Sequence, residues 1–219
     1  MNITKTISGC LLIAVLFIIS YCGGETRDRD GNSYKMVKIG KQEWMAENLK
    51  VSHFRNGDRI PEARSSEEWV RSAEGGKPAW CIIQNDPENG KKYGKLYNWF
   101  AVNDPRGLAP KGFHIASDDE WTQLTNFLGG GMIAALKMRS SGFADNVNET
   151  NQNRFEGLPG GNRSNNGAFF GLDSFGYWWS STEFNESDAW IRLLNYVLCD
   201  IKSPVYNKSF GLSVRCIRD

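Results

Sequence analysis

The chain has 219 residues, a formal net charge of +1, eight Trp, twelve Phe and 23 Gly. This length predicts one domain behind a processed N-terminus. A charge so close to neutral gives no indication of nucleic-acid binding, so we expect no nucleic-acid partner. Many aromatic residues together with many glycines indicate a loop-rich domain whose core is aromatic rather than aliphatic.

The N-terminal segment has the pattern of an export signal. Lys5 precedes an almost unbroken apolar run at 11–19, which is too short for a comfortable transmembrane span. Cys22 follows and is placed like the lipid-bearing residue of a bacterial lipoprotein. We therefore predict a lipoprotein-type signal peptide at 1–21, acylation of Cys22 and a membrane partner held through the lipid. Ordinary cleavage with release of the chain is the alternative.

The residues after the signal indicate location and domain limits. Gly23, where an Asp would favour the inner membrane, favours the outer membrane, so we expect a lipid-anchored protein of the cell envelope. Without acylation the protein would be secreted. Residues 22–29 form a polar tether too short to hold a domain far from a membrane. The domain itself is expected at 30–219.

The domain opens with a hairpin pattern. Alternating residues at 34–39 predict a strand, and a glycine-lysine pair predicts a turn into a second strand at 42–45. Residues 28–32 resemble part of a calcium loop, but Ile39 stands where the bidentate Glu would be. A turn is therefore the interpretation, and no metal site is predicted.

Two helices are predicted in the middle of the chain. The first covers 94–102 and has one apolar face. The second covers 117–128 and opens with a capping box between Ser117 and Glu120. Residues 65–69 are a candidate for a further short capped helix.

Loops and strands complete the pattern. Residues 85–90 and 140–171 are predicted as surface loops from their composition, and extended segments follow at 175–183 and at 210–219. Alternation puts Trp178 on the face opposite its two aromatic neighbours. In the last segment the residues that share one face are Phe210, Leu212, Val214 and Cys216. The predicted fold class is α+β, with mixed, mainly antiparallel sheets, two helices and long loops.

Several phrases resemble one protein family, the Fibrobacter succinogenes major paralogous domain. They are the Trp-Met-Ala-Glu-Asn-Leu of 44–49, the Tyr-Gly-Lys-Leu-Tyr-Asn-Trp of 93–99, the Leu-Pro-Gly-Gly of 158–161, the Gly-Tyr-Trp-Trp-Ser-Ser of 176–181 and the Gly-Leu-Ser-Val-Arg-Cys of 211–216. The resemblance covers nearly all of 30–219. It implies a secreted or lipid-anchored protein of Fibrobacter- or Bacteroidetes-type bacteria, in a family whose members generally lack an assigned activity.

The order of elements also resembles the C-type-lectin-like fold of formylglycine-generating enzymes. That resemblance implies a closely spaced copper-binding cysteine pair, which this sequence lacks. The Glu-Pro-Asn and Trp-Asn-Asp motifs of calcium-dependent sugar-binding lectins are also missing. A C-type-lectin-like fold is therefore expected without the chemistry of either group.

The cysteines and histidines give no catalytic set. Export makes a disulfide reasonable, and shared strand parity makes Cys199–Cys216 the expected pair if a bridge forms, with three reduced buried thiols as an equal alternative. His53 and His114 are not at ligand spacing from other donors, so neither a zinc site nor a Ser–His–Asp arrangement is predicted. We expect a protein that is not an enzyme and that has no cofactor.

Ligand contact is expected at aromatic and amide side chains. Trp178 and Trp179 would stack on a sugar if exposed, with burial of both as the alternative. The polar loop at 148–166 is the candidate rim, through Asn162, Arg163 and Asn165.

The expected function is a lipid-anchored cell-surface module that binds a polysaccharide or a surface protein. Exposed aromatics beside the candidate rim would favour this interpretation. A structural or assembly lipoprotein of the envelope is the alternative, which a large apolar patch would favour. A remote enzyme related to the formylglycine-generating enzymes is a third hypothesis.

Overall fold

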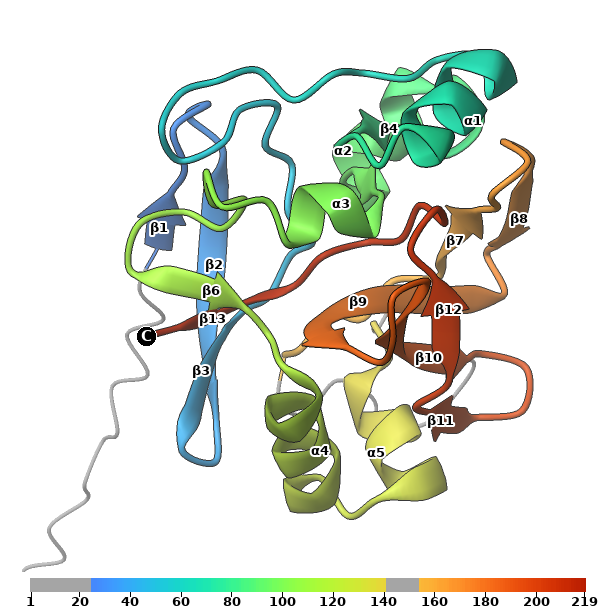
Figure 1. Ribbon diagram of the computed structural model, residues 1–219. Helices are drawn as coiled ribbons and strands as arrows, with labels where there is room; N and C mark the ends of the chain where they lie inside the picture. Colours follow the sequence, from blue (N-terminus) through green and yellow to red (C-terminus); the bar gives the residue numbers. More distant parts are fainter. Residues whose placement is uncertain (1–24, 141–153) are drawn as a thin grey trace, which may run out of the picture.

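The computed structural model describes residues 25–140 and 154–219 and has the predicted α+β fold (Figure 1). Every pairing between its named strands is antiparallel. Within the described ranges, no helix has the length and apolar character needed to cross a membrane. The predicted signal peptide, the lipidation site and the part of the polar loop before residue 154 lie outside the described residues.

The first sheet contains both ends of the domain. Its strand order is β1-β2-β3-β13-β6, so the last strand of the chain lies in the middle of the sheet. The predicted hairpin is confirmed, with Val37 opposite Trp44. The strands are β1 (Glu25–Arg27), β2 (Ser33–Ile39), β3 (Gln42–Met45), β6 (Phe113–Ile115) and β13 (Cys216–Arg218).

The second sheet is built on one long antiparallel pair. β9 (Phe175–Glu183) pairs with β10 (Asp188–Asn195), whose other edge pairs with β11 (Asp200–Lys202) and β12 (Val205–Asn207). Two small two-stranded sheets complete the strands. They are β4 (Trp80–Cys81) with β5 (Leu96–Tyr97), and β7 (Gly160–Arg163) with β8 (Phe169–Leu172).

The described residues form five α-helices, whereas the sequence predicted two and a further short candidate at 65–69. α4 (Asp118–Phe127) has the expected capping box between Ser117 and Glu120, and α1 (Ser66–Glu74) has a similar one. α3 (Trp99–Val102) is shorter than predicted. The two helices that the sequence did not predict are α2 (Pro87–Tyr93) and α5 (Gly131–Met138).

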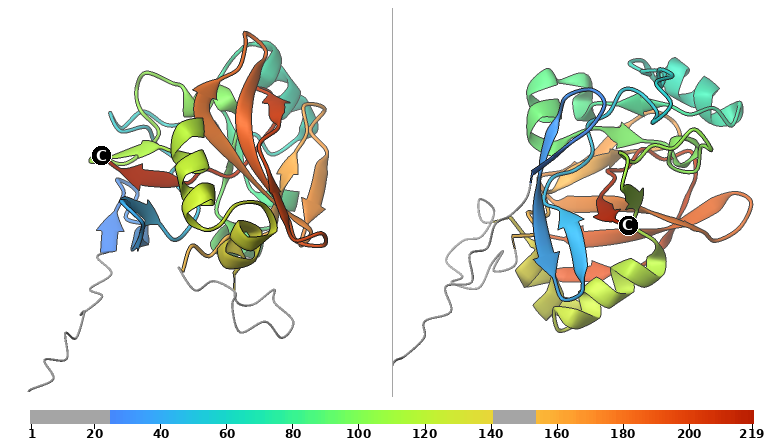
Figure 2. Two further views of the ribbon diagram at one scale, coloured as in Figure 1. Left: turned by 90° about the horizontal axis from the view of Figure 1, so that it is seen from below. Right: turned by 90° about the vertical axis from the view of Figure 1, so that its left-hand side faces the viewer.

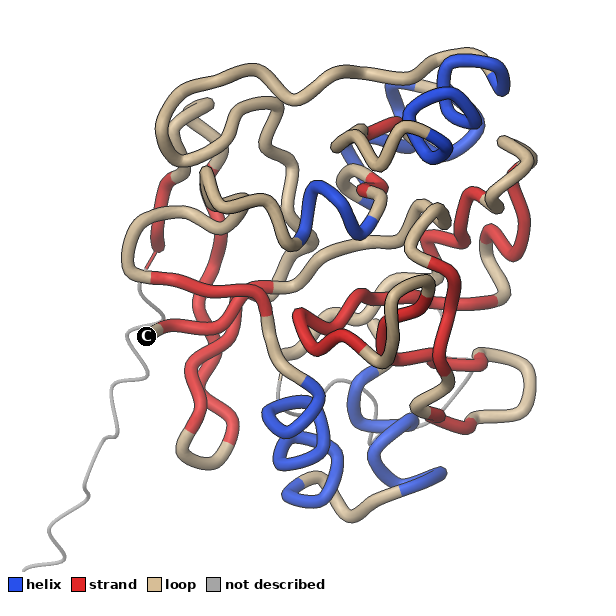
Figure 3. Tube along the Cα trace, viewed as in Figure 1, coloured by secondary structure: helices blue, strands red, loops and turns tan. Residues whose placement is uncertain are grey.

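The unpredicted helices have local causes. Residues 85–90 read as a loop, but Asp86 caps α2 by accepting a hydrogen bond from the Glu88 amide, and Pro87 occupies the first turn. The three glycines after α4 end that helix as predicted, but the last of them starts α5. Figure 2 shows α4 and α5 beside the second sheet, while Figure 3 shows the long irregular path between β3 and α1.

Residues 212–217 near the end of the chain run between two apolar clusters. Leu212, Val214 and Cys216 belong to the first cluster, while Ile217 belongs to the second. Tyr177 and Trp179 likewise face the first cluster and Trp178 the second. The alternation read from the sequence is therefore confirmed, although only residues 216–218 form a continuous strand.

Candidate functional site

The two predicted stacking residues, Trp178 and Trp179, are completely buried. The Trp178 indole N–H donates to Asn48 Oδ1 at 2.8 Å, and that of Trp179 donates to the Tyr97 carbonyl at 2.7 Å. The sequence left burial of both rings open as the alternative, and the structure confirms that alternative. Neither ring can stack on a ligand, because helices α4 and α5 cover one and the first cluster encloses the other.

Asn162 and Arg163, expected at a ligand rim, are also buried. The Arg163 guanidinium donates to three main-chain carbonyls, those of Gly167 at 3.0 Å, Ala63 at 2.7 Å and Ser65 at 2.8 Å. This side chain therefore joins the β7–β8 hairpin to the start of α1. Its predicted role in ligand binding was wrong, since its donors are taken up by the fold.

Three of the phrases that carry the family resemblance, 44–49, 176–181 and 211–216, meet around Arg215. This fully buried guanidinium donates to the carbonyls of Ala46 at 2.7 Å and Phe155 at 2.6 Å, and to Asn48 Oδ1 at 2.8 Å. The same Asn48 oxygen accepts from Trp178. These buried side chains thus hold the scaffold together and offer no groups to a ligand.

The predicted Cys199–Cys216 disulfide is not formed. All three cysteines of the described residues have free thiols. Cys199 lies in the turn after β10 with a φ of 50°, and Arg139 Nη1 is 2.9 Å from its sulfur. Cys216 is buried inside the first sheet, and burial raises its pKa to about 12. Strand parity failed as a guide because Cys199 is not on a strand.

Both histidines pair with carboxylates. His53 Nδ1 lies 2.6 Å from Asp30 Oδ1, and His114 lies 2.7 Å from Glu120 and 2.8 Å from Asp219. Within 25–140 and 154–219, no group of three or more His, Cys, Asp or Glu side chains could hold a metal ion.

Of the three residues named for the rim, Asn162, Arg163 and Asn165, only Asn165 is exposed. It lies in the turn of the β7–β8 hairpin, at a surface cavity of about 390 Å³. Amide, carboxylate and hydroxyl groups gather there above the small apolar side chains of α1. The lining residues are Val70, Ala73, Glu74, Asn165, Asn166 and Ser209.

The same hairpin presents an exposed aromatic residue that the sequence analysis missed. Phe170 on β8 is 56% exposed, whereas its neighbour Phe169 packs against a buried cluster. Its register partner is the buried Asn162 on β7. The alternation of two adjacent phenylalanines was the available signal, but the segment read as a loop because Asn, Gly and Ser surround it.

Comparisons with known proteins give one result. A search of curated proteins and a search of solved structures each gave no match. A family model matches residues 37–218, which is nearly the whole of the described domain. The chain therefore belongs to the Fibrobacter succinogenes major domain family.

Proposed function

We propose that the protein is a lipid-anchored cell-surface module, not an enzyme, that binds a glycan at the β7–β8 hairpin. The observation that carries the proposal is the exposed Phe170 on the hairpin whose turn places Asn165 at a cavity. An exposed aromatic residue beside the polar loop is the feature that we expected to favour ligand binding. Phe170 is such a residue, in place of the predicted tryptophans.

The chemistry of the hairpin suits a sugar. A phenyl face packs against the C–H face of a pyranose ring, because both are apolar and flat. Asn165, Asn166 and Glu74 offer amide and carboxylate groups to sugar hydroxyls. A few polar groups beside an apolar surface are the usual composition of a small-ligand site.

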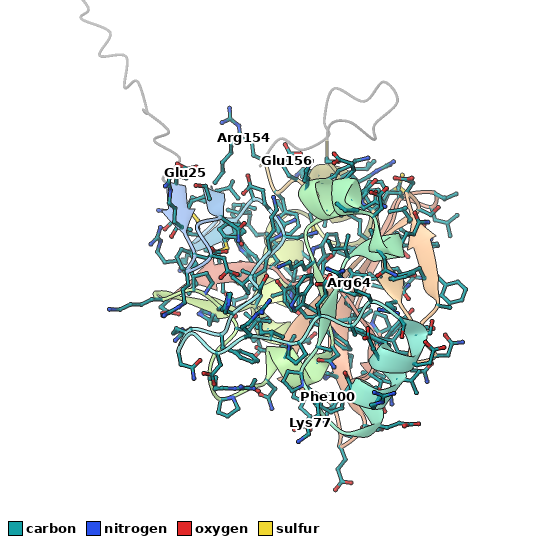
Figure 4. All side chains as sticks on the ribbon, turned by 90° about the horizontal axis from the view of Figure 1, so that it is seen from above. Glu25, Arg64, Lys77, Phe100, Arg154 and Glu156 are labelled. Carbon is teal, nitrogen blue, oxygen red and sulfur yellow. The ribbon has the colours of Figure 1, made fainter. Side chains whose placement is uncertain are left out.

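The position of the hairpin is compatible with an anchored protein. Cys22 precedes Glu25, the first described residue, by only three positions. Glu25 lies at one edge of the molecule in Figure 4, and in Figure 1 β1 and the β7–β8 hairpin lie on opposite sides. A lipid at Cys22 would therefore leave the hairpin free to face away from the membrane.

The test is binding of the purified chain from residue 24 onward to a broad array of plant and microbial polysaccharides. We expect a saturable hit that Phe170→Ala weakens about tenfold, since one aromatic contact contributes on the order of 1 kcal/mol or more. Asn165→Ala should weaken it as well. Phe184→Ala is the matched control, because Phe184 is 52% exposed but lies between β9 and β10.

If both hairpin variants bind the polysaccharide as tightly as the wild type, the binding site lies elsewhere on the protein. A blank across the array would contradict glycan binding. Chelator in a parallel assay shows whether a cation takes part.

The assembly hypothesis is the second candidate, and a specific observation favours it. Five of the seven large apolar side chains that are exposed in the described residues come from only two places, the end of α4 with the first turn of α5, and the β10–β11 turn. Clustered apolar exposure is typical of protein–protein or membrane contact. The residues are Phe127, Met132, Ile133, Val197 and Leu198. A blank array together with cross-links in the envelope through α5 would support this function instead.

A further inference from the structure

A second cavity, here called the lysine cavity, lies between the β1–β2 turn and helix α2. It has a volume of about 380 Å³ and shares no lining residue with the cavity at the hairpin. Three of its side chains are lysines and none is a carboxylate. The lining residues are Asn32, Lys50, Ile82, Pro87, Gly90, Lys91 and Lys95.

Lys95 is the fixed cation of this cavity. Its ammonium lies 3.7 Å from the centroid of the Trp80 ring and donates a hydrogen bond to Ser52 Oγ. The side chain is half-buried, and Trp80 beneath it is only 8% exposed. A cation–π contact in such a partly desolvated place is stronger than one in water. The charge is therefore positioned before any ligand arrives, which reduces the ordering cost of binding.

The three acidic groups that act on Lys95 already have partners within the fold, and one of them, Glu62, pairs with Arg64 at 3.0 Å. Asp28 accepts hydrogen bonds from the Asn32 amide at 2.9 Å and from the Tyr34 hydroxyl at 2.6 Å. Asp30 accepts from the Ser52 amide and pairs with His53. These carboxylates act on Lys95 through space without forming an ion pair with it.

Two further lysines stand at the rim. Lys50 Nζ donates to the Lys91 carbonyl at 3.3 Å, which holds the two residues side by side. Lys91 Nζ pairs with Glu88 Oε1 at 2.6 Å, but both side chains are 74% exposed. An ion pair so exposed contributes little and is readily exchanged for another anion.

We propose that the lysine cavity binds an acidic sugar residue through its carboxylate. The lysines supply charge-assisted donors for the anionic group. Ile82 and Pro87 supply an aliphatic wall for the C–H face of the ring. An open surface cavity of about 380 Å³ with an aliphatic wall has room for one sugar ring, whereas an extended acidic peptide would run beyond it. The site goes beyond the hairpin site and is independent of it.

The protonation of Lys95 gives the site a defined pH dependence. Burial lowers the pKa of Lys95 to about 8, although nearby carboxylates act in the opposite direction. The ammonium is therefore charged below about pH 8 and loses its charge above that value. Binding of the anion should weaken as the pH rises through this range. The charged groups that face Lys95 or the rim are Asp28, Asp30, His53, Glu62, Glu88, Lys50 and Lys91.

The experiment compares trigalacturonate with the neutral galactose trisaccharide by titration calorimetry on the chain from residue 24 onward. We expect binding of the acidic sugar alone, with at least a tenfold loss of affinity in Lys95→Met. Lys41→Met is the control, because it removes the same charge from the β2–β3 turn, at the other end of β2. Phe170→Ala should leave this binding intact, which separates the site from the hairpin.

Several outcomes would overturn the proposal. They are equal binding of the neutral trisaccharide, unchanged affinity in Lys95→Met, or tighter binding of poly-glutamate, which would indicate an acidic protein partner. A sulfated galactose oligomer distinguishes carboxylate from sulfate: binding of this oligomer alone would refute the carboxylate. Should Lys95→Met fail to fold by circular dichroism, Lys50→Gln at the rim takes its place, with a several-fold loss expected.

Discussion

The guanidinium of Arg215 shows how a buried charge is stabilised without a carboxylate. Its donors meet carbonyl oxygens from two separate segments and the side-chain oxygen of Asn48. Removing a charge from water is costly, and only a full set of hydrogen bonds compensates for it. Arg163 follows the same principle at the hairpin. Arginines that look available for ligands in the sequence thus serve as cross-links between loops.

His114 gives a prediction at the same scale. Burial alone would lower its pKa, but hydrogen bonds with Asp219 and Glu120 outweigh burial and raise the pKa above the ordinary 6.5. A raised pKa means that the group stabilises the fold fully below about pH 6.5, and that this contribution is lost as the pH rises through the folded-state pKa.

We therefore expect His114→Gln to be more destabilising at about pH 6 than at about pH 8, by less than about 1 kcal/mol because the pair is partly exposed to solvent. Urea unfolding of both proteins at the two pH values measures the difference. Asp219→Asn leaves Glu120 as the carboxylate partner of His114. Its effect on the free energy of unfolding should therefore differ less between the two pH values than the effect of His114→Gln. A pH-independent difference between wild type and His114→Gln would contradict this account.

At the scale of elements, the β7–β8 hairpin depends on close backbone approach at Gly161. Its φ is 64°, and a Cβ atom there would lie 2.5 Å from the Phe170 carbonyl oxygen. Gly112 also has a positive φ of 80°, but nothing lies within 4 Å of its Cβ position. Substitution of Gly112 therefore tests conformational strain alone, whereas substitution of Gly161 tests strain together with a steric clash.

We expect Gly112→Ala to cost on the order of 1 kcal/mol, from the strained conformation alone. Gly161→Ala should cost clearly more, because the clashing atoms belong to the backbone and cannot turn away. It should also weaken any ligand binding at the hairpin. Urea unfolding followed by circular dichroism compares the two variants, and equal costs would show that the hairpin adjusts without difficulty.

At the scale of the whole molecule, the end of the chain joins the two apolar clusters. Leu212 and Val214 face one cluster and Ile217 the other, while β13 is paired on both sides. The chain that enters through β1 therefore ends in the middle of the same sheet. A truncation at the C-terminus would remove strand pairing and core residues at once.

The proposed anchor gives a prediction that concerns the whole protein. Cys22→Ser should move the protein from the membrane fraction to the soluble fraction, because a serine hydroxyl cannot carry the thioether-linked lipid. Cell fractionation with immunoblotting measures this. Cys10→Ser is the control and should leave the protein in the membrane, since Cys10 precedes the apolar run. An unchanged distribution of Cys22→Ser would refute the lipoprotein assignment.

Features that depend only on neighbours along the chain could be predicted without the structure. The hairpin at 34–45, the capping box of α4 and the opposite orientation of Trp178 and Trp179 all follow from local spacing. Such patterns act over a few residues, so no distant contact has to be known. The family resemblance belongs to the same group, because its phrases are contiguous.

Which side chains reach solvent could not be predicted, because it depends on contacts between distant segments. Trp178 is buried because α4 and α5 cover it, and Arg163 because carbonyls at the start of α1 surround it. Phe170 is exposed although its neighbour is not. The lysine cavity joins residues that are up to 63 positions apart, from Asn32 to Lys95. Burial depends on what distant segments bring against a residue, and local spacing carries no record of that.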